Sequence, residues 1–379
     1  MSAVPMPAPL PPGRQVLVTE FADSPPEAIE RFVTLVAQPA PDPASLAADE
    51  VIVAIRAASV GWVDLLMTSG QYQHMAEPPY CPGIEYAGVV ERVGTGVDPA
   101  RCREGDRVIV DFMQVGPRTG GAYRRASGFA SYAVVPAQAL HPIPARLDFD
   151  QAACLLGAYE TAHHCLVTRA QLRAGETVLV TGAAGATGLA AVQVAKRLGA
   201  TVIGTGRSDA KLAVVRALGA DHVVNSRGGE GEPEVRRFRD EVKALTGGRG
   251  VDVVYDTVGG EVSLECLRCV DFGARFVIVG WTSTPDVARG RGQRGAPRAN
   301  QLPTNLIQMK GLSVLGAPAV ISVGRDPSLR PPRLAQVLDW AERGEIVPHV
   351  SHTFPLERFR DAMRARWDGE VIGGCVLRP

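Results

Sequence analysis

Small residues are concentrated at one tight turn, between an apolar β-type run at residues 178–180 and a helix-type pattern. Aligned with the spacing Gly-x-Gly-x-x-Gly, the turn places Ala183 at the first position, with Gly185 and Gly188 at the others. Small side chains there let backbone N–H groups approach phosphate oxygens at the positive end of a helix. A second β-type run at residues 201–205 completes a βαβ unit, which predicts a dinucleotide site. The alternative is a tightly turned βαβ unit without a ligand. The predicted pyrophosphate contacts are Ala183, Gly185, Ala186, Thr187 and Gly188.

The side chains after the second β-type run indicate which dinucleotide is bound. A site for NADH usually carries Asp or Glu about 20 residues past the glycines, where it accepts from the ribose 2′-hydroxyl. Here Gly206 holds that place, followed by Arg207 and Ser208, with Lys211 one helical turn further. Arg and Lys can pair with a 2′-phosphate, and a serine hydroxyl can donate to it. We therefore predict NADPH as the cofactor; the alternative is that these residues form a solvated helix start.

The composition indicates a two-domain enzyme. The 379 residues carry 40 basic and 40 acidic side chains, and this balance gives no signal for nucleic acid or an anionic membrane. The chain is too long for one ordinary core. No apolar run approaches the ~20 residues that a membrane span requires. Residues 1–14 are rich in proline without the pattern of a signal peptide, so we predict a disordered tail there.

The cysteines give only a weak indication of metal or redox chemistry. Seven of them are scattered along the chain, which favours free thiols in a reducing compartment and predicts a cytoplasmic protein. Cys266 and Cys269 form a Cys-x-x-Cys pair inside a helical stretch, but no second pair stands at a zinc-ligand spacing.

The elements that must position these residues fall into two groups. β-type runs separated by Gly, Pro and Asp occupy the first part of the chain, at residues 50–56, 87–93, 107–111 and 131–136. Strands then alternate with helices, which predicts a doubly wound parallel sheet with strands at residues 177–180, 201–204, 222–224, 251–255, 275–279 and 312–315. Helices are expected at residues 334–343 and 356–366, and a last strand at residues 374–377 that rejoins the first domain. We therefore predict a cofactor domain at residues 157–316 and a β-rich domain at residues 15–156 and 317–379.

Two long segments are rich in arginine and glycine. Residues 114–128 contain Arg118, Arg124 and Arg125, and residues 282–303 contain four further arginines. Loops of this length inside a compact domain are usually functional or disordered. Two interpretations stay open: mobile solvated loops, or a basic rim for an anionic substrate such as an acyl-CoA.

The sequence resembles the medium-chain dehydrogenase/reductase superfamily, in its zinc-free quinone oxidoreductase branch. The resemblance extends from about residue 30 over nearly the whole chain, and its turn and Pro-Thr-Asn-Leu blocks are most similar to the quinone oxidoreductase-like 2 proteins and their bacterial relatives. It implies a Rossmann domain joined to a β-rich GroES-like catalytic domain. The blocks that carry it are residues 58–64, 70–72, 82–88, 93–97, 105–108, 182–188, 218–220, 255–260 and 303–306.

The departures from the zinc enzymes of this superfamily bear on the chemistry. The three positions that hold their catalytic zinc carry Gly61, Ile84 and Ala158 here, and none of these side chains can coordinate the metal. The region of their structural zinc, residues 115–128, contains no cysteine. Without a Lewis acid, an alkoxide loses its main stabilisation. Hydride addition to a quinone or an activated C=C bond does not need that metal, so we expect a zinc-independent reductase.

The resemblance also implies roles for individual residues. Tyr72 corresponds to a tyrosine implicated in proton delivery in the enoyl reductases; the alternatives are a water molecule as donor, or a tyrosine that packs under a loop. Thr161 corresponds to a threonine near the nicotinamide amide, unless its hydroxyl bonds to its own helix. Glu85, without a metal beside it, is expected to pair with a base or to bond to loop backbone. The further cofactor residues are Val258, Gly280, Trp281 and Asn305, and the substrate pocket is expected to include Gly61, Asp64, Glu85, Tyr159 and His163.

These observations predict an NADPH-dependent reductase of quinones or enones. The alternatives are an enoyl-thioester reductase, and an NADPH-binding protein with little activity and a structural or regulatory role. The substrate would be a small molecule. In relatives the last strand of the cofactor domain, here residues 312–315, pairs with its twin across a two-fold axis, so we expect a homodimer.

Overall fold

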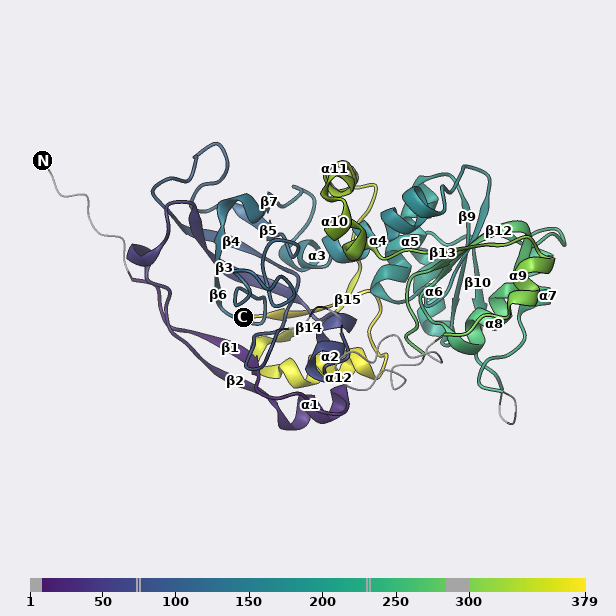
Figure 1. The fold of residues 1–379 in the computed structure, drawn as a ribbon, viewed down its shortest axis with the longest axis horizontal. Helices are drawn as coiled ribbons and strands as arrows, with labels where there is room; N and C mark the ends of the chain where they lie inside the picture. Colours follow the sequence, from purple (N-terminus) through teal and green to yellow (C-terminus); the bar gives the residue numbers. More distant parts are fainter. Residues whose placement is uncertain (1–8, 73, 75, 230, 232, 284–299) are drawn as a thin grey trace, which may run out of the picture.

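The computed structural model describes residues 9–72, 74, 76–229, 231, 233–283 and 300–379. They form two domains built on separate sheets, with the β-rich domain to the left in Figure 1 and the parallel sheet to the right. This architecture confirms the predicted fold class. Most of the predicted basic segment at residues 282–303 lies outside the described residues, as do residues 1–8 of the predicted tail.

The β-rich domain is organised around strand β3 (Glu50–Ser59), which is buried along almost its whole length. Its sheet has the order β14-β15-β3-β4-β5-β7, and β6 also pairs with β3. Strand β15 comes from the carboxyl end and pairs with β3, which confirms that the last strand rejoins the first domain. The other strands are β4 (Tyr86–Val93), β5 (Arg107–Val110), β6 (Tyr132–Pro136), β7 (Leu140–Pro142), β14 (Val350–Pro355) and β15 (Gly374–Arg378).

The predicted tail ends earlier than expected. Residues 13 and 14 form the start of strand β1 (Gly13–Val18), which pairs antiparallel with β2 (Val33–Gln38). The strand alternates, with Val16 and Val18 buried in the core, and removal of these side chains from water stabilises the pairing. The proline-rich composition is therefore no guide to structure beyond residue 12.

The short helices of this domain lie near the junction with the other one. Helix α2 (Trp62–Thr68) and helix α12 (Phe359–Trp367) meet through Trp62 and Trp367, whose rings stack with centroids 5.2 Å apart. Figure 1 places both helices beside α1 (Pro25–Arg31), at the lower middle of the molecule. A further helix, α3 (Phe149–Ala153), packs on strand β3.

The second domain contains a six-stranded parallel sheet with the order β10-β9-β8-β11-β12-β13. Numbered within the domain this is 3-2-1-4-5-6, the doubly wound order that binds dinucleotides at the carboxyl ends of its strands. Alternate residues of each central strand belong to different apolar clusters, so both faces are covered. The strands are β8 (Thr177–Val180), β9 (Thr201–Gly206), β10 (His222–Asn225), β11 (Val251–Asp256), β12 (Val270–Ile278) and β13 (Ser313–Gly316). The helices are α5 (Ala186–Arg197), α6 (Asp209–Ala217), α7 (Arg239–Leu245), α8 (Gly260–Cys269) and α9 (Thr304–Met309).

Helices α4 (Leu156–His163), α10 (Ala319–Arg325) and α11 (Arg330–Glu342) connect the domains, and a π-helical segment, His164–Arg169, follows α4. Helix α11 begins four residues before the predicted start at residue 334. The predicted start was too far along the chain because it was placed after the two prolines that follow Arg330. Proline is well tolerated in the first turn of a helix, and here both prolines belong to that turn.

A buried ionic network joins these connecting helices to the β-rich domain. Arg330 donates to both carboxylate oxygens of Glu160 at 2.8 and 3.0 Å and to Asp111 at 2.6 Å. Arg333 donates to Glu160 at 3.1 Å. Burial would raise the pKa of Asp111, but the His141 ring, 3.6 Å away, and the hydrogen bond from Arg330 outweigh it and hold that pKa well below its usual range.

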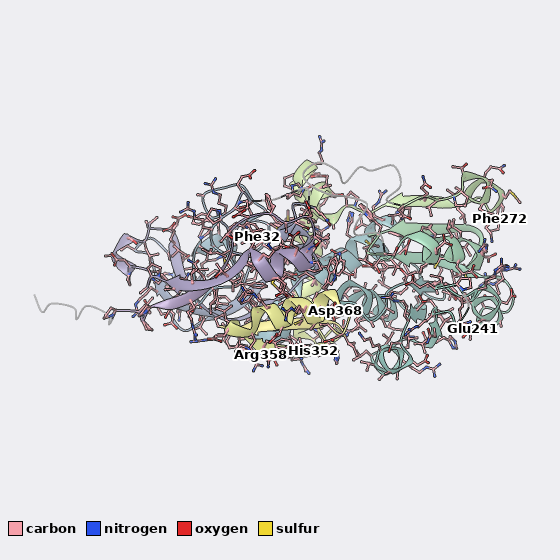
Figure 2. The ribbon with its side chains drawn as sticks, turned by 90° about the horizontal axis from the view of Figure 1, so that it is seen from below. Phe32, Glu241, Phe272, His352, Arg358 and Asp368 are labelled. Atoms are coloured by element: carbon pink, nitrogen blue, oxygen red, sulfur yellow. The ribbon has the colours of Figure 1, made fainter. Side chains whose placement is uncertain are left out.

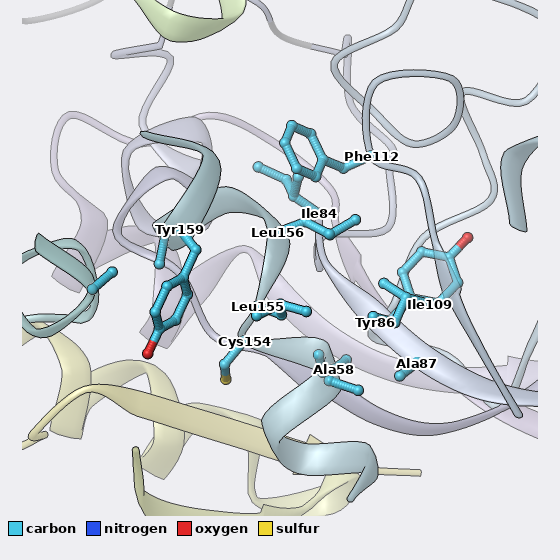
Figure 3. Close-up of a cluster of buried hydrophobic side chains, with 14 of the residues drawn as sticks. Ala58, Ile84, Tyr86, Ala87, Ile109, Phe112, Cys154, Leu155, Leu156 and Tyr159 are labelled. Atoms are coloured by element: carbon cyan, nitrogen blue, oxygen red, sulfur yellow. The ribbon is translucent and has the colours of Figure 1, made fainter. Parts of the chain in front are cut away.

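The apolar core continues without interruption from the β-rich domain into the helices next to it. Figure 3 shows part of this cluster, where Ile84, just before β4, lies next to Leu156 at the start of α4, and Tyr86 lies beside Ile109. The amino end of β4 and the amino end of α4 are therefore held at a fixed separation.

Candidate functional site

The glycine-rich turn after β8 has the close packing that a dinucleotide site requires. A Cβ at Gly188 would lie 2.3 Å from the carbonyl oxygen of Gly182, so only glycine fits where helix α5 meets the turn. Ala183 is fully buried, and its N–H donates to the carbonyl of Thr205 on β9 at 3.0 Å. Its methyl group packs toward Gly204, which explains why alanine is accepted at the first position of the pattern.

A buried carboxylate fixes this turn against the next strand. Asp256, at the end of β11, accepts from the Thr181 hydroxyl at 2.8 Å, from the Ser263 hydroxyl and from the N–H groups of Val258 and Gly259. Burial raises the pKa of Asp256, while these hydrogen bonds oppose that effect. The carboxyl ends of β8 and β11 are therefore held together beside the turn.

The amino end of α5 fits the pyrophosphate of a dinucleotide. Gly185 occupies the N-cap position and provides no side-chain cap, so the first N–H groups of this 12-residue helix can bind an anion. Ala186 and Thr187 of the first turn are partly exposed. The β-rich domain reaches the same turn, because Gly373 N donates to the carbonyl of Ala184 at 2.8 Å. The turn is thus at the junction of the two domains.

The predicted 2′-phosphate residues lie together at the end of β9. Arg207 is 69% exposed in its side chain and pairs with exposed Glu234 at 3.1 Å. Ser208 is the N-cap residue of α6, yet its hydroxyl makes no capping hydrogen bond. Lys211 donates to the carbonyl of Gly369, in the loop after α12. Burial lowers the pKa of Lys211, and the charge of Arg207 lowers it further.

Four other predicted cofactor residues are divided between two places. Val258, Gly280 and Trp281 follow β11 and β12 at the carboxyl edge of the sheet, and Trp281 packs across Gly259. Asn305 is exposed in the first turn of α9, which Figure 1 shows on the outer side of the sheet. Sequence reasoning did not identify Asn300, whose side-chain oxygen accepts from Gly260 N at 3.3 Å.

The remaining cofactor residue and its neighbour are on α4. Thr161 is half-buried one turn after Gly157. A Cβ at Gly157 would lie 2.5 Å from Oε2 of Glu85, so the missing side chain makes room for that carboxyl group. Glu85 Oε1 accepts from Gly157 N at 2.6 Å, so its partner is backbone in the first turn of α4, whereas a base or loop backbone was expected. Burial raises the pKa of Glu85 to about 7, against the effects of that hydrogen bond and of Arg118.

Asp64 organises the loops around Glu85. Its carboxylate is 2% exposed and accepts from the N–H groups of Gly61, Gly83 and Ile84 at 2.9, 3.0 and 3.1 Å. Burial raises the pKa of Asp64, and the three bonds and the charge of Arg118 counteract it. Both carboxylate oxygens of Asp64 accept backbone hydrogen bonds, so its role is to position the loops around Glu85.

Tyr72 lies against an arginine from the first basic segment. Arg118 Nη1 donates to the Tyr72 hydroxyl oxygen at 3.4 Å, and its guanidinium lies 6.0 Å from the centre of the Tyr72 ring. The same guanidinium stacks over Phe112 at 5.0 Å. Arg124 and Arg125, the other arginines of the segment, are exposed. The structure thus brings Tyr72, Glu85 and Asp64 into the electrostatic range of Arg118.

Two of the predicted pocket residues are instead engaged in helix packing. Tyr159 is 2% exposed, and its hydroxyl donates to Gln193 of α5 at 3.0 Å. His163 is 6% exposed and contacts Gln336 at 2.5 Å and the ring of Trp340 at 5.6 Å, both on α11. Burial lowers the pKa of His163. Sequence reasoning placed both in the pocket because it located the helix without knowing which of its sides would meet α5 and α11.

Sequence reasoning also passed over the group next to Tyr72. Gln71 is 2% exposed, and neither polar atom of its side chain has a partner among the described residues. Its position in the Gly-Gln-Tyr block was the available signal. Arg118 was noticed only as one of several arginines in a loop, because nothing in the local sequence separates it from Arg124 and Arg125.

The positions of the catalytic zinc ligands are occupied as the sequence indicated. Ile84 and Ala158 are each 6% exposed, and Gly61 lies at the amino end of α2. Within the described ranges, no group of three or more His, Cys, Asp or Glu side chains is arranged to hold a metal ion. The metal independence of the protein stays a prediction.

Comparison with known proteins gives matches over both domains. Residues 47–145 match the family described as alcohol dehydrogenase GroES-like domain, and residues 186–327 match zinc-binding dehydrogenase. Quinone oxidoreductase-like protein 2 of Bos taurus is 35% identical, with 83% of this chain and 80% of that protein covered. Its homolog in Nematostella vectensis is 32% identical, with 88% and 82% covered.

The solved structures give the same result for the fold. A mycobacterial protein whose structure is described as complexed with NADPH has a TM-score of 0.74 and 26% identity, covering 97% of this chain and all of that one (100%). The sequence blocks, the sheet order and these matches agree. The chain belongs to the medium-chain dehydrogenase/reductase superfamily, oxidoreductases that bind a nicotinamide cofactor, and within it to the quinone oxidoreductase-like proteins.

Proposed function

We propose that this protein is an NADPH-dependent, zinc-independent reductase of quinones or activated C=C bonds. The observation that carries this proposal is the placement of Tyr72, Glu85 and Arg118 in one region of the catalytic domain, where the zinc-ligand positions are Gly61, Ile84 and Ala158. Such a site can donate protons and stabilise negative oxygen, but its side chains offer no set of metal ligands.

The cofactor would be held by the turn and strand ends of the second domain. The N–H groups at the amino end of α5 would bind the pyrophosphate, and Arg207, Ser208 and Lys211 would surround the 2′-phosphate. Thr161 would lie toward the nicotinamide amide. Bound there, NADPH supplies a hydride, that is, a proton with two electrons.

On an enone, the electron pairs move in a defined order. The hydride bonds to the β-carbon, the C=C pair shifts toward the carbonyl carbon, and the carbonyl pair moves onto oxygen to give an enolate. A proton then bonds to the α-carbon, and we propose that Tyr72 or a water that it orients delivers it. Glu85, with a pKa near neutrality, can exchange a proton in the same region.

The direct test is an NADPH oxidation assay with 1,4-quinones, enones and crotonyl-CoA as separate substrates. Turnover of quinones or enones above a no-enzyme control supports the proposal. Turnover of crotonyl-CoA alone would identify an enoyl-thioester reductase instead. Tight NADPH binding without turnover of any of the three would point to a binding protein with a structural or regulatory role and would contradict a reductase.

We also propose a homodimer formed through strand β13. This strand lies at the edge of the sheet, and edge strands of this kind are usually covered. Two large apolar side chains, Phe272 and Met309, are 78% and 69% exposed near the same edge. Figure 2 shows Phe272 at the far end of the cofactor domain, away from the catalytic domain. A contact there would leave the site between the domains open.

A cytoplasmic location is proposed from the cysteines. All seven are buried and unpaired as disulfides, which suits a reducing compartment. Among the described residues no helix has the length and apolar character to cross a bilayer. Fractionation of cells that express the tagged protein tests this proposal, and recovery in a membrane or secreted fraction would contradict it.

A further inference from the structure

Arg118 differs from Arg330 and Arg333 because no carboxylate among the described residues pairs with its charge. Arg330 and Arg333 form short bonds to Glu160 and Asp111. Arg118 has no carboxylate within 4.0 Å among the described residues, and its one hydrogen bond is the 3.4 Å contact with Tyr72. Among the described residues, its buried Nε–H has no acceptor. A partly buried guanidinium in this state is costly unless an acceptor arrives.

The surroundings of Arg118 fix its position without supplying that acceptor. The guanidinium stacks on Phe112, and Arg118 is half-buried at a turn closed by the Thr119 hydroxyl, which donates to the Gly116 carbonyl at 2.9 Å. The charge of Arg118 acts on the carboxyl groups of Glu85 and Asp64, but these groups accept hydrogen bonds from backbone N–H groups. A fork of N–H donors is therefore held ready beside Tyr72 for an oxygen anion.

We propose that Arg118 is the oxyanion-binding residue of the site, and that the substrates are α,β-unsaturated carbonyl compounds whose carbonyl oxygen binds to its guanidinium. This inference rests on the proposed reductase function and narrows its substrate class. When hydride bonds to the β-carbon, the carbonyl pair moves onto oxygen, and Arg118 stabilises the resulting enolate. Arg118 donates its hydrogen bond to the Tyr72 oxygen, so the phenol proton is not used in that bond. The proton stays available for transfer to the α-carbon.

The oxygen anion could have a second source, because a carboxylate carried by the substrate has the same chemistry. The two sources differ in when the charge exists. A carboxylate is charged in the ground state, so removal of Arg118 would weaken substrate binding and raise KM. An enolate is charged only after hydride transfer, so removal of an Arg118 contact with it would lower kcat.

The experiment compares trans-6-oxo-4-heptenoate with its methyl ester, which are the same enone with and without a carboxylate, because two saturated carbons separate the carboxyl group from the C=C bond. The variants are Arg118→Met, which removes the charge, and Arg118→Lys, which keeps it without the fork. Arg125→Met is the control, since Arg125 is an exposed arginine of the same loop. We expect Arg118→Met to lower kcat on both compounds by roughly 100-fold, as loss of an oxyanion donor does. Arg118→Lys should recover part of the loss, and Arg125→Met should match the native protein.

Two outcomes of these kinetics would overturn the proposal. An unchanged kcat for Arg118→Met on the ester would exclude an enolate contact. A rise in KM for the acid alone would assign Arg118 to a substrate carboxylate instead. Circular dichroism and NADPH affinity of each variant show whether a loss of rate reflects misfolding, and free guanidinium should restore activity to a folded Arg118→Ala variant only if the missing group acts directly.

A binding measurement separates this inference from the proposed function. The probe is 4-nitrophenol, whose anion absorbs in the visible range and resembles an enolate in charge. We expect the native protein to bind it as the phenolate and to lower its apparent pKa by roughly one unit, as an opposite charge does. Arg118→Met should abolish that shift. If the native protein reduces no alkene but shows the shift, only the reductase function fails; an equal shift in both proteins overturns the role of Arg118.

Discussion

The carboxyl group of Glu85 lies directly on the amino end of helix α4, where Oε1 accepts a 2.6 Å hydrogen bond from Gly157 N. The contact joins the β-rich domain to the helix that carries Thr161. Any side chain at position 157 would displace the carboxyl group, since a Cβ there would lie 2.5 Å from Oε2. A titratable group thus occupies the connection between the catalytic and cofactor domains.

Glu85 should make stability fall as pH rises toward neutrality. Burial raises its pKa from 4.5 to about 7, so between these values the folded protein holds a proton that the unfolded chain has released. Stability then decreases with pH across that window, by about 1.4 kcal/mol per unit of pKa difference at most, and levels off above it. Glu85→Gln should flatten the slope between about pH 5 and 7 in urea unfolding, whereas Glu20→Gln, at an exposed position, should leave it unchanged. Equal slopes for native protein and Glu85→Gln would contradict the raised pKa.

NADPH should bind at least ten-fold more tightly than NADH. Charge-assisted hydrogen bonds to a phosphate contribute about 1.5–3 kcal/mol each, and less where they are exposed, as Arg207 is. The measurement is a fluorescence titration of both cofactors. The double variant Arg207→Gln and Lys211→Gln should lose most of the preference, and Arg216→Gln, further along α6, should keep it. Equal affinities in the native protein would refute the prediction.

The turn after β8 could be predicted from sequence because its chemistry is local. Close backbone contact requires small residues at fixed spacing. The strand and helix patterns on either side of the turn can be recognised in the sequence without tertiary information. The same strand and helix patterns predicted the fold class. The roles of Tyr159, His163 and Arg118 depend on which helices and loops pack against them. Sequence spacing places a residue on a helix but does not say which side another helix will cover.

The length of the proline-rich tail shows the same limit at smaller scale. Composition predicts disorder to residue 14, yet residues 13 and 14 gain a pairing partner in β2, more than 15 residues later in the sequence. Pairing between strands depends on a distant segment, so composition of the tail alone could not show where order begins.

The protein should show no metal requirement. The positions of the catalytic ligands carry Gly61, Ile84 and Ala158, which cannot coordinate zinc. Activity should survive dialysis against a chelator, and elemental analysis of the purified protein should find less than about one zinc per ten chains, since a bound site needs four ligands. Stoichiometric zinc, or activity that returns only when zinc is added, would contradict the assignment.

The protein should be a dimer at micromolar concentration. Light scattering should give twice the mass of the 40.1 kDa chain, or four times if dimers associate further. Replacing an exposed apolar side chain by a charge at the interface, as in Met309→Asp, should shift the distribution toward monomer. Leu245→Asp is the control, because Leu245 is a less exposed apolar residue at the end of α7, an element outside the β13 edge. A native monomer would refute the β13 interface.

Tyr72→Phe tests the proton donor, because it keeps the ring beside Arg118 and removes only the hydroxyl group. General-acid assistance contributes about 10²–10⁴-fold, but water can replace a missing donor, so we expect turnover of enones to fall by roughly ten-fold or more. Folding and NADPH affinity should hardly change, since the ring contacts remain and the hydroxyl's 3.4 Å bond to Arg118 is long. Quinones should suffer less, because a hydroquinone anion is a weaker base than an enolate. The measurement is kcat under conditions where a deuteride isotope effect shows that hydride transfer limits the rate. If kcat on every accepted alkene is unchanged there, Tyr72 has no part in protonation, and the reaction depends on cofactor position, Arg118 and solvent.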